Sequence, residues 1–152
     1  MSARKGASPV RRVRLGPPML WTFAAEDPGT PARAREAVRA FAADQGADGD
    51  TLAAIELCVS EAVSNAATHA YRKLGRRGPV EVEARHPGDY LSVYVRDQGS
   101  GPRRRQDSPG LGLGLPLIGQ AAADLDVRPR ATGGTEVLMV FELSQSAARD
   151  IA

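Results

Sequence analysis

Three polar side chains that could do chemistry recur four residues apart in the stretch LCVSEAVSNAATHAY, residues 57–71. They are the acid Glu61, the amide Asn65 and the imidazole His69. On a helix they lie within about 80° of one another, beside the apolar stripe of the same segment. Their polar ends would point along the rim of the buried side, where a pocket can form. A plain helix with polar residues at its rim would show the same row.

Three glycine-containing motifs follow in the chain, and each offers a different kind of contact. In DQGSG, residues 97–101, a carboxylate at a strand end could accept a hydrogen bond from an exocyclic amine, and the glycines would let the backbone approach a flat ring. PGLGLGL, residues 109–115, opens a predicted helix and could present N–H donors to phosphate. GGT, residues 133–135, precedes the last predicted strand. Each motif is common on its own, and an ordinary turn would explain it equally well.

Familiar nucleotide-binding motifs of other folds are absent from the sequence. Neither lysine completes a G-x-x-x-x-G-K-[ST] loop, and the run G-L-G-L-G-L follows a polar loop where G-x-G-x-x-G requires a strand. The triplet DQG is not preceded by the H-R-D loop of eukaryotic-type protein kinases. These three classes of nucleotide site are therefore excluded.

Hydrophobic periodicity predicts the elements that must position these residues. Thr30 and Asp50 are the expected caps of the first two helices, with Pro31 in the first turn of the first helix. The predicted strands are 19–25, 80–85, 90–97, 125–130 and 135–144, and the predicted helices are 32–45, 51–73 and 114–123.

The order of these elements predicts the fold class. Strands cluster and helices cluster, which indicates an α+β protein. We expect a two-layer sandwich, in which a mixed, mostly antiparallel sheet carries the helices on one face. We predict one domain over residues 17–146, a flexible basic tail over 1–16 and a short tail over 147–152.

Composition limits the classes of function. The chain has 152 residues, 42% apolar and 25% charged, with no apolar run long enough for a membrane span. The net charge is only +2, and no basic stripe alternates with aromatic residues, so we expect no direct contact with nucleic acid. The single cysteine, Cys58, falls on the apolar side of a helix and should be a buried, inert thiol. A cytoplasmic location is expected.

Taken in order, the motifs resemble those of a known fold. The chain reads E-x-x-x-N on a helix, D-x-G-x-G after a strand, G-x-G-x-G opening a helix, and G-T before a strand. This series resembles the N, G1, G2 and G3 boxes of the GHKL ATP-binding fold of gyrase, chaperone, histidine-kinase and MutL ATPase domains. The wording SEAVSNAATHAY and GLGLGLPLIGQAAADLDV is closest to the bacterial anti-sigma-factor serine/threonine kinases. The resemblance covers residues 19–144.

The resemblance implies a role for each matching residue in an ATP and Mg²⁺ site. Asn65 would bind Mg²⁺, and Glu61 would be the catalytic carboxylate that accepts the proton of a substrate serine. Asp97 and Thr135 would hold adenine. The remaining cofactor-binding residues would bring backbone close to the base or to the phosphates: Gly99, Gly101, Gly110, Leu111, Gly112, Leu113 and Gly114.

The sequence leaves the roles of some residues open. The segment PRRRQDSP between the second and third boxes is short for an ATP lid, so closure over ATP should be modest. Arg103, Arg104 and Arg105 could meet phosphates or a partner's acidic groups, or lie in a solvated loop. His69 belongs to the rim of the pocket, through packing or through contact.

The resemblance implies a protein serine/threonine kinase that sequesters a sigma factor and phosphorylates a STAS-type anti-anti-sigma protein, working as a homodimer. A nucleotide-gated partner-binding regulator without kinase turnover is the alternative. A detached histidine-kinase catalytic domain is disfavoured because the chain has no phosphoacceptor helix. Nucleic-acid binding would rest only on the basic tail.

Overall fold

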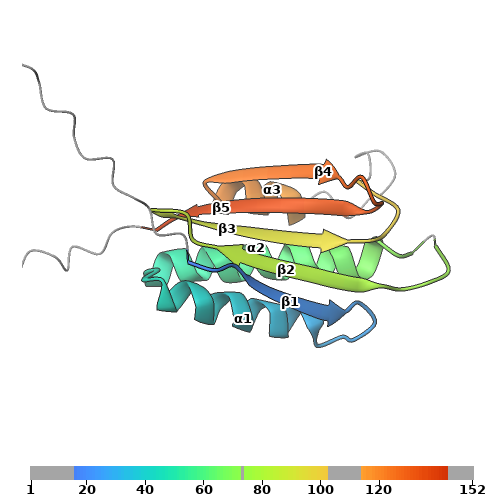
Figure 1. Cartoon of the computed structure of the whole chain (residues 1–152), viewed down its shortest axis with the longest axis horizontal. Helices are drawn as coiled ribbons and strands as arrows, with labels where there is room; N and C mark the ends of the chain where they lie inside the picture. Colours follow the sequence, from blue (N-terminus) through green and yellow to red (C-terminus); the bar gives the residue numbers. More distant parts are fainter. Residues whose placement is uncertain (1–15, 73, 103–113, 144–152) are drawn as a thin grey trace, which may run out of the picture.

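The computed structural model describes residues 16–72, 74–102 and 114–143, which form one sheet and three helices in the predicted order (Figure 1). The helices are α1 (Thr30–Asp44), α2 (Gly49–His69) and α3 (Gly114–Ala121). The strands are β1 (Met19–Ala24), β2 (Pro79–Arg85), β3 (Tyr90–Asp97), β4 (Asp124–Pro129) and β5 (Thr135–Glu142).

The five strands form a single sheet in the order β1-β2-β3-β5-β4, and all four pairings are antiparallel. The helices lie together behind this sheet (Figure 1): α1 packs against β1 and β2, α2 against β2, β3 and β5, and α3 against α2 and β4. The predicted α+β sandwich with helices on one face is therefore confirmed, and its sheet is antiparallel throughout the described strands.

The core forms where the alternating strands meet the apolar stripe of α2. In β3, Leu91, Val93 and Val95 are buried, as the period of two predicts for a strand with one covered face. On α2 the buried residues recur at helical spacing and include Cys58, as predicted. Burial raises the pKa of the Cys58 thiol to about 11, so the thiolate form is disfavoured.

The helix caps differ from the sequence prediction. Thr30 is the first residue of α1 rather than its cap, and its buried Oγ1 donates to the Ala24 carbonyl at 2.6 Å. Asp48 rather than Asp50 caps α2, because its Oδ1 accepts the Thr51 N–H at 2.8 Å. In both cases the tertiary position of the loop, which the sequence pattern does not show, decides which polar side chain meets the helix end.

Helix α2 is also shorter than predicted and ends at His69 rather than near residue 73. The Ala70 carbonyl accepts the Ser100 N–H at 2.9 Å. The helix therefore ends against the segment that follows β3, and this contact brings two of the predicted motifs together. None of the helices in the described parts of the chain is long and apolar enough to cross a membrane.

Candidate functional site

The row of polar residues on α2 lies beside the buried stripe, as the helical spacing predicts. Ala62, Val63 and Ala66 are buried, whereas Glu61 and Asn65 are half-buried. Both side chains therefore stand at the boundary between the core and solvent. This is the position from which a side chain can reach a bound ligand without leaving its helix.

Asp97 is the buried acid of the site, with only 6% of its surface exposed. Its Oδ1 accepts the N–H of Gly99 at 2.8 Å and the N–H of Thr135 at 3.2 Å. One carboxylate oxygen thus joins three residues that the sequence predicted to act together. Among the described residues, no hydrogen bond reaches the other oxygen, Oδ2, which can therefore accept one from a ligand.

Burial raises the pKa of Asp97. The two backbone N–H bonds and the nearby Arg130 guanidinium act in the opposite direction and limit this rise. The acid is held in place by fixed backbone donors and has little access to water. Such a carboxylate suits the recognition of a neutral amine on an aromatic base, because little water competes with the amine for a hydrogen bond to the buried oxygen.

Two glycines allow the three segments of the site to approach closely. A Cβ on Gly99 would lie 2.0 Å from the Ala70 carbonyl oxygen at the end of α2. A Cβ on Gly134, whose φ is +90°, would lie 2.1 Å from the Asp97 carbonyl oxygen. The sequence assigned Gly99 to contact with a ligand. The structure gives it a separate requirement, since the turn of DQGSG packs directly on the backbone of α2.

Tyr71 is a buried residue of the site that the sequence prediction missed. Its hydroxyl donates to the Pro79 carbonyl at 2.6 Å and accepts the Gln98 N–H at 2.9 Å. It thereby fixes the end of α2 to β2 and to the residue after Asp97. An aromatic residue directly after the polar row was the only signal for it in the sequence.

Arg130 is the second residue that the sequence did not single out. Its Nη1 donates to the Asp97 carbonyl at 2.8 Å, and its Nη2 lies 3.8 Å from Oε2 of Glu81. Its own backbone N–H donates to Gly134 at 3.0 Å. Arg130 stands in the turn between β4 and β5, so only the folded sheet brings it to the strand end of β3.

These segments match a known family. A sequence model described as a histidine kinase-like ATPase domain matches residues 24–141. The chain belongs to the histidine kinase-like ATPase domain family. The GHKL fold predicted from the order of the four motifs is therefore confirmed, and membership of this ATPase family implies that the domain binds ATP.

Two solved structures resemble this ATPase domain. One contains the RsbU and RsbW domains of Rv1364c from Mycobacterium tuberculosis, with 26% identity, a TM-score of 0.65, and coverage of 84% of this chain and 33% of that one. The other is the histidine kinase domain of the Erythrobacter litoralis EL346 blue-light activated histidine kinase, with 27% identity, a TM-score of 0.51, and coverage of 76% and 60%. The chain thus spans a third of the first protein's length and 60% of the second's.

Among curated proteins, none is similar enough to the chain to count as a match.

Part of the predicted ATPase site lies outside the described residues. This holds for Gly110, Leu111, Gly112 and Leu113 of the third motif, and for Arg103–Arg105 before it. Gly114 is the first residue of α3. The structure brings Asp97, Gly99, Gly101 and Thr135 together around the end of α2, with Glu61 and Asn65 further back on the same helix.

Proposed function

We propose that this ATPase-family domain is a protein serine/threonine kinase that transfers the γ-phosphoryl group of ATP to a partner protein. The observation that carries the proposal is Glu61, one helical turn before Asn65 on the helix whose end packs against the Asp97 segment. An acid there can serve as a proton acceptor beside the phosphates. The likeness to a structure that contains an RsbW domain supports this choice among kinase classes.

The nucleotide would lie between α2 and the glycine-bearing segments. Oδ2 of Asp97 would accept a hydrogen bond from the adenine amino group, with Thr135 as a second partner and Gly101 beside the base. The backbone N–H groups from Gly110 to Gly114 would meet the phosphates at the start of α3. Asp97 is already ordered by two backbone bonds, so little reorganisation is needed on binding.

Asn65 would hold Mg²⁺ through its amide oxygen. Within the described ranges, no group of three His, Cys, Asp or Glu side chains is arranged to hold a metal ion. A single protein oxygen, that of Asn65, fits Mg²⁺, because this ion is commonly bound by one or two protein oxygens together with phosphates and water. When bound, Mg²⁺ would neutralise charge on the phosphates.

Glu61 would act as the general base. Its carboxylate would take the hydroxyl proton of the substrate serine or threonine while that oxygen attacks the γ-phosphorus, with ADP as the leaving group. Most of the remaining rate enhancement in such reactions comes from position and charge, which the fixed helix α2 supplies.

The expected partners are a sigma factor and a STAS-type anti-anti-sigma protein, with no direct binding of nucleic acid or membrane. We also propose a homodimer. The sheet face opposite the helices exposes apolar side chains such as Leu20, of which 61% is exposed, and could take part in that contact. Light scattering of the purified chain would show the mass of a dimer. A cytoplasmic location stays a prediction.

A nucleotide-gated binding module without kinase turnover is the second candidate, since ATP binding does not require Glu61. Three variants separate the two functions: Glu61→Ala, Asn65→Ala and the control Glu56→Ala, whose side chain pairs with Arg39 at 2.5 Å outside the row. Each is mixed with γ-labelled ATP and STAS proteins of the same genome.

We expect Glu61→Ala to abolish phosphate transfer while ATP still binds by calorimetry. Asn65→Ala should lose both, and Glu56→Ala should keep both. If no STAS protein is phosphorylated by the unaltered protein, or if Glu61→Ala transfers phosphate normally, the kinase proposal is wrong.

A further inference from the structure

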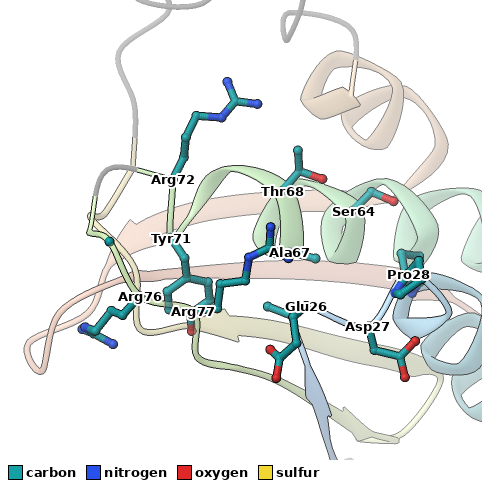
Figure 2. Close-up of a pocket in the computed structure, with 13 residues that line it drawn as sticks. Glu26, Asp27, Pro28, Ser64, Ala67, Thr68, Tyr71, Arg72, Arg76 and Arg77 are labelled. Carbon is teal, nitrogen blue, oxygen red and sulfur yellow. The ribbon is translucent and has the colours of Figure 1, made fainter.

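A concave site lies beside the C-terminal half of α2, between that helix, the loop from β1 to α1, and the segment that follows α2 (Figure 2). The pocket encloses about 700 Å³. Ser64, Ala67 and Thr68 of α2 form one wall, and Glu26 and Asp27 form another. None of the residues assigned to the nucleotide lines it, but Tyr71 does, and its hydroxyl also accepts the N–H of Gln98 next to Asp97, so the pocket adjoins the Asp97 segment.

The pocket adjoins the flank of α2 that carries Glu61. Ser64 and Thr68 come three and seven residues after Glu61, so they follow it along one side of the helix. Asn65, four residues after Glu61, is rotated roughly 40° toward the other flank, whereas Ser64 is rotated roughly 60° toward the pocket. Glu61 therefore stands between the predicted Mg²⁺ ligand and this pocket.

The charges around the pocket are unbalanced. Three arginines line it, namely Arg72, Arg76 and Arg77. Arg77 extends across the pocket toward α2, whereas Arg72 and Arg76 project from its rim (Figure 2). Of the acids on the opposite wall, Asp27 already pairs with Arg33.

Two of these arginines are available to a partner. Arg76 donates to the Gln98 carbonyl at 3.4 Å, but the guanidinium groups of Arg72 and Arg77 form no ion pair or hydrogen bond with other described residues. Guanidinium groups at the edge of a concave site match carboxylates well, because each can offer two parallel N–H donors.

We propose that this pocket binds an acidic segment of the protein that the domain phosphorylates, and so places the acceptor hydroxyl beside Glu61; this rests on the proposed kinase function. The acidic side chains meet Arg72 and Arg77, and the backbone of the segment crosses Ser64 and Thr68 toward Glu61. The segment approaches from the flank opposite Asn65. Nucleotide and protein substrate thus reach the same carboxylate from two sides of one helix.

The decisive variant is the double substitution Arg72→Glu and Arg77→Glu, because neither side chain supports the fold through a described contact. The matched control is Arg39→Glu with Arg128→Glu, which makes the same charge change on half-exposed arginines of α1 and β4 outside the pocket. Those two arginines form exposed ion pairs, and charge reversal sets a carboxylate beside the former partner; because solvent screens charges at such exposed positions, the effect on stability should be small.

The first measurement uses a fluorescein-labelled peptide of alternating Glu and Ser, titrated with the full chain and followed by anisotropy. We expect the pocket variant to weaken binding by about tenfold or more, and the control to leave it within about twofold. If the unaltered protein does not bind the peptide, or both variants weaken it equally, the inference is overturned.

The second measurement uses STAS proteins of the same genome and compares KM, kcat and ATP affinity. We expect the pocket variant to raise KM for the protein substrate and to leave kcat and ATP affinity unchanged. A loss of ATP affinity would show that the arginines bind phosphates and would overturn the inference. If nothing is phosphorylated by the unaltered protein, the kinase proposal fails, while the peptide titration still decides whether the pocket is an acidic-segment site.

Discussion

A methyl group added at Gly134 should damage both the fold and the nucleotide site. The Cβ of an alanine there would lie 2.1 Å from the Asp97 carbonyl oxygen, whereas ordinary contact begins at 3.4 Å. The two backbones must therefore separate by about 1.3 Å, an overpacking that costs about 1–3 kcal/mol. The φ of +90° adds backbone strain of about 1–3 kcal/mol for any residue with a side chain.

Gly133 offers a matched control in the same turn. Its φ is +95°, but an added Cβ would meet nothing within 4 Å, so Gly133→Ala carries the strain without the crowding. We predict that Gly134→Ala loses about 1–3 kcal/mol more unfolding free energy than Gly133→Ala in urea titrations. At about 2–4 °C per kcal/mol for a chain of this length, their melting temperatures should differ by about 2–12 °C.

Calorimetry with ATP gives the second readout of this comparison. The atoms displaced in Gly134→Ala belong to Asp97 and the residue after it, so ATP affinity should fall, whereas Gly133→Ala should bind ATP nearly normally at a temperature where both are folded. Equal stability and equal ATP affinity of the two variants would refute the argument that close approach at Gly134 sets the position of Asp97.

Three further predictions concern single side chains. Burial raises the pKa of Asp97, so its ionised form destabilises the fold: the stability contributed below pH 3.8, the ordinary pKa, is lost as the pH rises through the raised pKa. ATP binding, which needs the carboxylate, should weaken as the pH falls through the same raised pKa. In calorimetry, Asp97→Asn should bind ATP more weakly and without this pH dependence. Tyr71→Phe should cost about 1–3 kcal/mol in urea titration because two backbone groups lose their partner, whereas the exposed Tyr90→Phe should cost almost nothing. Burial would raise the pKa of Glu83, but hydrogen bonds from Arg85 and Arg96 lower it below its ordinary value. The stability that Glu83 contributes is therefore present above pH 4.5 and is lost as the pH falls through the lowered pKa. Glu83→Gln should cost about 1–3 kcal/mol of unfolding free energy near neutral pH and less in acid.

The local elements could be predicted from the sequence because each has a clear period. The alternation in YLSVYVRD marks Leu91, Val93 and Val95 as the covered side of a strand, and all three are buried. The ends of α2 could not be predicted in the same way. Its start depends on a cap two residues before the expected one, and its end depends on the hydrogen bond between Ala70 and Ser100, which are 30 residues apart.

The outward sheet face shows a second limit of pattern reasoning. The alternation in VEVEAR, residues 80–85, favours a strand with one face open to solvent, yet only 7% of Glu83 on that face is exposed. Arg85 pairs with Glu83 from the same strand, and Arg96 donates to it at 2.6 Å from β3. Both guanidinium groups also stack on the Tyr94 ring. Burial there follows from cross-strand register, which alternation within one strand does not contain.

The site divides along the same line. The sequence groups Asp97, Gly99 and Thr135 through the order of their motifs along the chain, and a single carboxylate oxygen joins them in the structure, while their roles toward a nucleotide stay predictions. Arg130 could not be found in this way. It reaches the Asp97 carbonyl only because β5 pairs with β3 and carries the β4–β5 turn to the end of β3.

Helix α2 explains why so much of the proposed chemistry can depend on so few residues. Its buried stripe fixes the helix against the sheet, so the side chains at its two edges cannot rotate independently of the core. One edge carries Asn65, and the other borders the pocket through Ser64 and Thr68. Glu61 lies between these two edges. In the proposed reaction its carboxylate must be near both the nucleotide and the protein substrate, and only a side chain between the two edges can be near both.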